Sequence, residues 1–71
     1  MASISVSLDR NADRHDVKLL KRELDTLPGV TSVSVSSGGQ LAVDYDATGV
    51  RQADILEKIQ ALGYYVRQEH A

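Results

Sequence analysis

Along this chain the spacing of hydrophobic residues changes twice, from every second residue to every third or fourth residue. This order limits the folds that the chain can adopt. Residues 3–9 alternate polar side chains with Ile4, Val6 and Leu8, which predicts a strand with one buried face. Residues 14–27 space their apolar side chains three or four apart, as an amphipathic helix does. The apolar stripe of this helix consists of Val17, Leu20, Leu24 and Leu27.

The second half of the chain repeats this order after a hairpin. Residues 30–36 and 41–46 alternate like strands, and the four residues between them carry two glycines, as a tight turn requires. Residues 52–62 form a second helix, and residues 64–67 form a short last strand before a polar tail at 68–71. The stripe of the second helix consists of Ile55, Leu56, Ile59 and Leu62.

The resulting order, βαββαβ, is that of the split βαβ or ferredoxin-like arrangement. Right-handed crossovers in the two βαβ halves place both helices on one face of a four-stranded antiparallel sheet. We therefore predict an α+β, ferredoxin-like sandwich that comprises a single domain, residues 1–71. The other sheet face should be open to water and rich in serine: Ser3, Ser5, Ser7, Ser32, Ser34, Ser36, Ala42, Asp44, Tyr65 and Arg67.

The composition excludes several classes of function. The chain has no cysteine, which removes disulfides, thiolate metal ligands and cysteine nucleophiles together. Its formal net charge is −2, so general attraction to nucleic acid or anionic lipid is not expected. No apolar run approaches the roughly 20 residues that span a bilayer, and the sequence opens without a signal-like pattern. We expect a cytoplasmic monomer that neither binds nucleic acid nor inserts into a membrane.

Three segments together resemble the heavy-metal-associated domain, a small copper-chaperone-like module. They are LPGVTSVSV at 27–35, LAVDYD at 41–46 and ADILEKIQALGYYV at 53–66. The resemblance runs from about Ile4 to Val66, nearly the whole chain, and implies the same ferredoxin-like fold. It also implies a metal loop of the form Gly-Met-x-Cys-x-x-Cys, which falls on residues 10–16.

That loop is rewritten throughout in this chain. Arg10 stands at the Gly position, Asn11 at the Met position, and Asp13 and Asp16 at the two Cys positions. Because Cu(I) prefers thiolate or thioether ligands, the carriage of soft metal that the resemblance implies does not extend to these residues. The resemblance also places Tyr64 close to the family's metal, and without the metal we expect Tyr64 to pack over the end of the core.

Asp13, His15 and Asp16 stand where the first helix begins, and three interpretations are open. Asp13 suits an N-cap and Asp16 favours the positive end of the helix dipole, so the pair resembles a capping box. Alternatively, both carboxylates and His15, with Asp9 or His70 nearby, would bind a Zn, Mn or Mg ion weakly. Thirdly, the paired carboxylates would act as acid and base, which requires unlike environments that an exposed loop does not offer.

Cations concentrate on one side of the first helix. This basic face consists of Arg14, Lys18, Lys21 and Arg22. It is either a solvated surface, paired in part with Glu23 and Asp25, or a surface that docks onto an acidic protein. In the resembling family, partner domains meet through the metal loop and the start of the first helix, which implies a metal-transporting ATPase or one of its domains as partner.

The sequence therefore favours a non-enzymatic docking or regulatory module linked to metal transport, which needs no cofactor. The alternative is a carrier for a harder ion that uses Asp13, His15 and Asp16, and an enzyme is the third choice.

Overall fold

The computed structural model describes the backbone of residues 2–70 and the side chains of residues 2–67. Its element order is the predicted βαββαβ. The elements are β1 (Ala2–Leu8), α1 (Arg14–Asp25), β2 (Val30–Val35), β3 (Gln40–Tyr45), α2 (Gln52–Ala61) and β4 (Val66–His70). The predicted ferredoxin-like class is confirmed.

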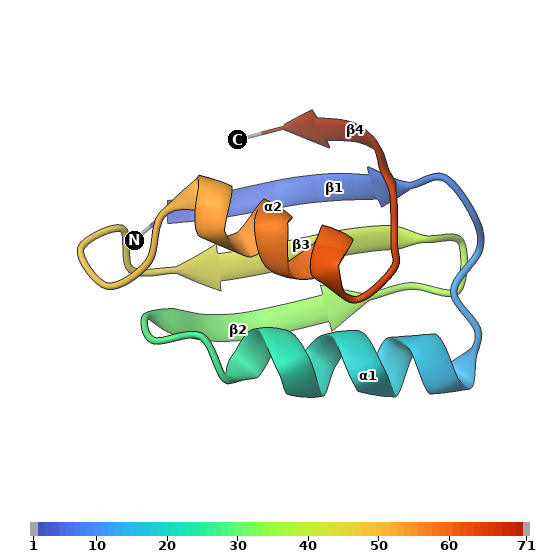
Figure 1. The fold of residues 1–71 in the computed structure, drawn as a ribbon, viewed down its shortest axis with the longest axis horizontal. Helices are drawn as coiled ribbons and strands as arrows, with labels where there is room; N and C mark the ends of the chain where they lie inside the picture. The colour runs from blue at the N-terminus through green and yellow to red at the C-terminus, as the bar shows by residue number, and fades with distance from the viewer. Residues whose placement is uncertain (1, 71) are drawn as a thin grey trace.

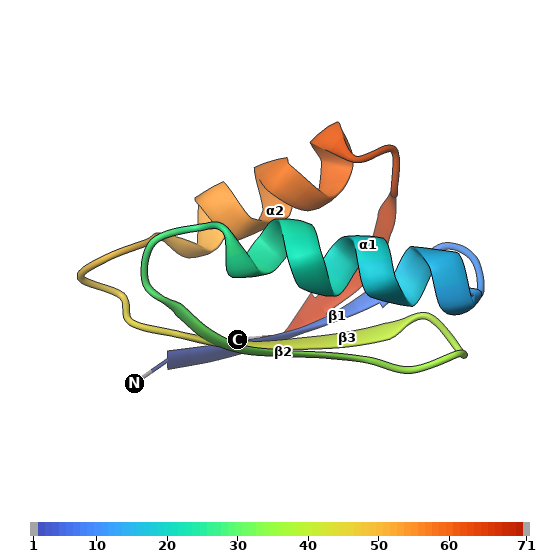
Figure 2. The same ribbon diagram turned by 90° about the horizontal axis from the view of Figure 1, so that it is seen from below.

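The four strands form one antiparallel sheet in the order β2-β3-β1-β4, and both helices cover the same face of it (Figures 1 and 2). The register places apolar residues opposite one another, with Ile4 facing Val43 and Val6 facing Leu41. These side chains point to the helix layer, which is why strict alternation in the sequence becomes one buried face. Within residues 2–70, neither helix is long or apolar enough to cross a membrane.

The core lies between the sheet and the two helices. Both predicted stripes contribute to it, since Leu20, Leu24, Ile55 and Ile59 are fully buried. The valines of β2 are only half-buried, because β2 is an edge strand with a neighbour on one side alone. Leu27, Leu56 and Leu62 pack against the core from partly exposed positions. Val17 is partly buried, and Leu19, which is outside the predicted stripe, packs against the core instead.

Three local expectations are corrected by the structure. The first helix ends at Asp25, two residues early, and Thr26 caps it by donating from Oγ1 to the carbonyl of Glu23 at 2.6 Å. The last strand is Val66–His70 instead of 64–67, because most of the expected polar tail pairs with β1. Ser7 is buried, and its hydroxyl donates to Oε1 of Gln40 at 3.2 Å beside a register shift at the end of β1.

Candidate functional site

The loop between β1 and α1, residues 9–13, is held to the rest of the molecule by backbone hydrogen bonds on two sides. The N–H of Ala12 donates to the carbonyl of Ser37 in the β2–β3 hairpin at 3.2 Å. The N–H of Asp9 donates to the carbonyl of Tyr65, just before β4, at 3.0 Å. Ala12 itself is 4% exposed. The loop that the resemblance assigns to metal is thus docked onto its neighbours by its own backbone.

Gly39 makes this docking possible. Its φ is +85°, and a Cβ built on it would lie 2.5 Å from the carbonyl oxygen of Arg10. Only glycine tolerates both this backbone conformation and this approach without strain. Gly39, one of the two glycines that the sequence placed in a hairpin turn, therefore also makes room for the loop.

Asp13 and Asp16 form a complete capping box at the start of α1. Oδ1 of Asp13 accepts from the N–H of Asp16 at 2.8 Å, and Oδ2 of Asp16 accepts from the N–H of Asp13 at 3.2 Å. Each carboxylate satisfies one N–H that a helix start leaves without a partner. The structure therefore gives both acids the capping role that their spacing suggested.

Asp16 has a second partner that the sequence did not indicate. The hydroxyl of Tyr64, just beyond α2, donates to Oδ1 of Asp16. The guanidinium carbon of Arg10 lies 4.7 Å from the centroid of the Tyr64 ring, within the range of a cation–π contact. We call these three residues the Arg10–Tyr64–Asp16 clamp. The clamp joins the loop, the first turn of α1 and the segment before β4.

Tyr64 packs at the end of the core as expected, with 3% of its surface exposed. Its hydroxyl is the part that sequence reasoning missed. A buried tyrosine generally needs a hydrogen-bond partner, and that requirement was the available signal. The partner itself could not be read from the sequence, because it lies 48 residues away.

The clamp moves two pKa values away from neutrality. The hydrogen bond from Tyr64 is the main cause of a lowered pKa for Asp16, and the N–H of Asp13 adds to it. Burial, followed by the hydrogen bond to Asp16, raises the pKa of Tyr64 to about 12. At neutral pH the pair is therefore a fixed carboxylate and a fixed phenol, whereas an acid–base catalyst needs a pKa near the working pH.

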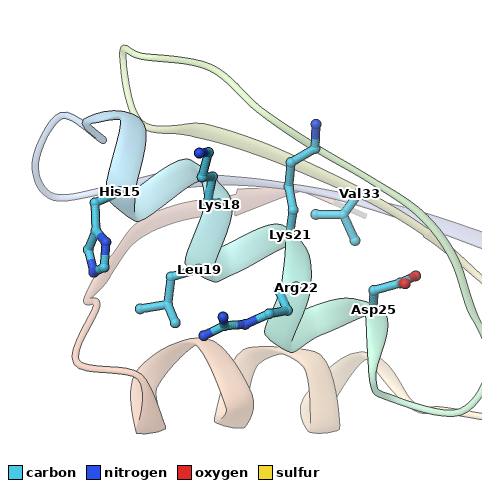
Figure 3. Close-up of a pocket in the computed structure, with 7 residues that line it drawn as sticks. All are labelled: His15, Lys18, Leu19, Lys21, Arg22, Asp25 and Val33. Atoms are coloured by element: carbon cyan, nitrogen blue, oxygen red, sulfur yellow. The ribbon is translucent and has the colours of Figure 1, made fainter.

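The predicted triad of Asp13, His15 and Asp16 does not converge. The two carboxylates face the helix start and Tyr64, while His15 lies on the side of α1 that carries Leu19 and Arg22 (Figure 3). Among the side chains that the structure describes, no three from His, Asp and Glu are placed together to hold a metal ion. The side chain of His70, considered as a further ligand, lies outside the described residues. A soft ion fits these donors no better, because the chain has no thiolate to offer.

The four residues of the basic face are all exposed. Of these cations, Arg22 alone makes an ion pair within residues 2–67, with 3.5 Å between its Nε and Oε2 of Glu23. Glu23 also pairs with Lys58 of α2, so it does not neutralise the rest of the face. Three cations thus remain free of any described ion pair: Arg14, Lys18 and Lys21.

An open hollow of about 680 Å³ borders this face, and we call it the α1–β2 hollow. Lys18, Lys21 and Arg22 line it together with Leu19, and Val33 contributes from β2 (Figure 3). His15 and Asp25 complete its lining. The structure thus places three of the four predicted docking residues around one concave surface, while Arg14 stands outside it.

Comparison with known proteins identifies relatives over most of the chain. A family model described as the heavy-metal-associated domain matches residues 12–65. The solved structure of the CopZ metallochaperone is 26% identical with a TM-score of 0.85, and covers 92% of this chain and 98% of its own. The N-terminal soluble domains of Bacillus subtilis CopA are 29% identical with a TM-score of 0.83, over 92% of this chain and 45% of theirs.

A copper binding domain from HMA7, a P-type ATPase, shares the fold over the full length of both chains, with 23% identity and a TM-score of 0.84. Among curated proteins there is no significant match to the sequence.

Proposed function

This chain belongs to the heavy-metal-associated domain family, and from that premise we propose that it is a docking or regulatory module linked to metal transport. The link rests on its relatives, which include a metallochaperone and a copper binding domain from a P-type ATPase. The docking role rests chiefly on one observation, the exposed basic face of α1 with three cations free of described ion pairs.

The proposed partner presents an acidic surface, and a metal-transporting ATPase or one of its soluble domains is the partner class we favour. A positive face speeds encounter with such a surface and disfavours partners of the same sign. The face begins at Arg14, within residues 10–16, the segment that the resemblance assigns to metal. The cytoplasmic location and the monomeric state both stay predictions.

We also propose that the module is non-enzymatic and works without a metal ion. The position of the family's second metal ligand is held by Asp16, whose carboxylate is engaged by Tyr64 and by the N–H of Asp13. A weakly bound Zn, Mn or Mg ion would have to compete with both hydrogen bonds. The shifted pKa values of Asp16 and Tyr64 likewise disfavour proton transfer at neutral pH.

Charge reversal on the basic face tests the docking role. The probe is a purified soluble domain of a P-type metal ATPase from the organism that carries this chain, titrated at low and high salt. Lys18→Glu and Lys21→Glu, made singly, should each weaken binding by up to about fivefold at low salt, because exposed ion pairs contribute up to roughly 1 kcal/mol. The difference should shrink as salt screens the charges.

Arg67→Glu is the matched control. It makes the same change of charge at an exposed position on β4, away from α1. It should bind like the original chain. Equal weakening by Arg67→Glu, or unchanged binding by both lysine variants, would refute docking through the basic face.

A further inference from the structure

The two edges of the sheet differ in how well they are protected. Natural sheets block exposed edges with charges, prolines, bulges or covering segments, because an open edge pairs readily with another chain. The β4 edge has the sequence VRQEH, which carries an arginine and a glutamate. The β2 edge has the sequence VTSVSV, which carries no charge and no proline. The register shift of β2 against β3 lies between Val30 and Ser32, at the start of the strand. Residues 33–35 are therefore the part of this edge that remains open to a further strand.

In an edge strand such as β2, alternate residues hydrogen-bond to the neighbouring strand. The pattern of these bonds to β3 identifies the backbone groups of β2 that are free to pair with a further strand. The N–H of Ser36 donates to the carbonyl of Gln40 at 2.9 Å, which closes the hairpin with a hydrogen-bonded pair. In an antiparallel ladder such pairs recur at every second residue. Ser34, opposite Ala42, is therefore the next bonded residue, and the N–H and C=O groups of Val33 and Val35 point away from β3. These two valines present the free pairing groups of the edge.

The space beside this edge is bounded by the basic face. α1 runs along β2 in both ribbon views and stands on the helix side of the sheet (Figures 1 and 2). Val33 lines the α1–β2 hollow together with Lys18 and Lys21 (Figure 3). A strand added outside β2 would turn every second side chain toward these two lysines. Acidic side chains would complement them, and the alternate side chains would lie beside the serines of the open face.

We propose that the β2 edge takes an extended acidic segment of the partner as a fifth strand. Its backbone pairs with Val33 and Val35, and its acidic side chains face Lys18 and Lys21. This proposal rests on the proposed docking function and specifies the structural form of the partner. A second copy of this chain fits less well, because two-fold pairing through β2 would bring the same cations of the two α1 helices together.

Amide hydrogen exchange measured by NMR tests the strand directly. The probe is a capped heptapeptide of alternating glutamate and threonine, which presents acids on one side and hydroxyls on the other. At saturation, the amides of Val33 and Val35 should exchange roughly tenfold more slowly. The amide of Ser34 should not change, because β3 already holds it. Amide changes confined to α1, or no binding at all, would overturn strand addition.

Two controls separate strand addition from simple charge attraction. The same peptide with alternate backbone nitrogens methylated keeps its charges but cannot complete a ladder, so it should lose the protection. Val33→Pro removes an outward N–H without taking a bond from β3, and should abolish peptide binding. If that variant fails to fold, the methylated peptide still decides the question.

The outcomes also show whether a failure lies in this proposal or in the docking function on which it rests. If Lys21→Glu weakens binding of the ATPase domain while Val33 and Val35 gain no protection, docking stands and the fifth strand is wrong. In the opposite case, Lys21→Glu does not weaken binding of the ATPase domain, but the peptide slows amide exchange at both valines. The β2 edge is then a binding site for an extended strand, and the proposed partner class is wrong. In the absence of peptide, slower amide exchange of Val33 and Val35 at higher protein concentration would show that a second copy of the chain pairs with the edge. That result would refute the proposal.

Discussion

Removing the hydroxyl of Tyr64 is the sharpest test of the Arg10–Tyr64–Asp16 clamp. Tyr64→Phe keeps the buried ring, and with it the contact with Arg10, but removes the hydrogen bond to Asp16. Hydrogen bonds to charged groups contribute roughly 1.5–3 kcal/mol when they are well shielded. Asp16 is half-exposed, so water replaces part of the loss, and we expect destabilisation of about 1 kcal/mol. In a domain of this size that corresponds to a fall in Tm of about 4–8 °C.

Urea unfolding followed by circular dichroism at pH 7 measures this change. The matched control is Tyr45→Phe, since Tyr45 is 5% exposed and its hydroxyl makes no hydrogen bond within residues 2–67. The control should change the free energy of unfolding by less than about 0.5 kcal/mol. A Tyr64→Phe variant as stable as the original chain, or no less stable than the control, would refute the clamp.

The pH dependence of stability gives an independent check. Because folding raises the pKa of Tyr64 from 10.0 to about 12, the contribution of its protonated hydroxyl is complete below pH 10. It is lost as the pH rises from 10 to 12, when the phenolate forms beside the Asp16 carboxylate. The stability gap between the original chain and Tyr64→Phe should therefore close over this interval. In an absorbance titration of the folded chain, Tyr64 should ionise above pH 10, since its pKa is raised to about 12.

Four further perturbations test the loop and the start of α1. Asp13→Ala removes the N-cap of α1 and should destabilise the fold by about 1 kcal/mol in urea unfolding; no change would mean that the capping box is idle. Gly39→Ala should destabilise by more than about 1 kcal/mol, since its Cβ would collide with the carbonyl of Arg10, and a neutral result would contradict the docked loop. Zn²⁺, Mn²⁺ and Mg²⁺ at micromolar concentration should leave the NMR amide signals of residues 9–17 unchanged, whereas saturable shifts abolished by Asp13→Ala with Asp16→Ala would establish the metal-carrier alternative. Asp16→Asn should lose less stability than the original chain as the pH falls below 3.8, because folding lowers the pKa of Asp16.

Together these predictions describe a loop that is held without metal. The resemblance assigns residues 10–16 to a metal loop. Here a capping box, a buried tyrosine hydroxyl and an arginine stacked on its ring hold the corresponding residues. All three are fixed contacts within the chain, so the loop needs no ligand to keep its position.

Most of the fold could be predicted from the sequence, because periodicity is a local property. The alternation of polar and apolar residues at 3–9, and the spacing of apolar residues by three or four at 14–27, indicate which side chains share a face. This holds whatever that face packs against. The boundaries were less certain where pairing decides them. The residues after Arg67 read as a polar tail, yet β1 supplies a pairing partner for them as far as His70.

The capping role of Asp13 and Asp16 was likewise within reach of the sequence, since the contacts of a helix start join residues three apart. The engagement of Asp16 by Tyr64 was not, because only the complete fold brings together residues 48 apart. The same holds for the edge position of β2, which follows from the strand order β2-β3-β1-β4 and not from the segment VTSVSV. The sequence by itself determined which residues form strands and helices and which chemistry the chain lacks. Only the tertiary structure decided which distant side chains meet and which strand is left without a neighbour, because both depend on how the elements pack in space.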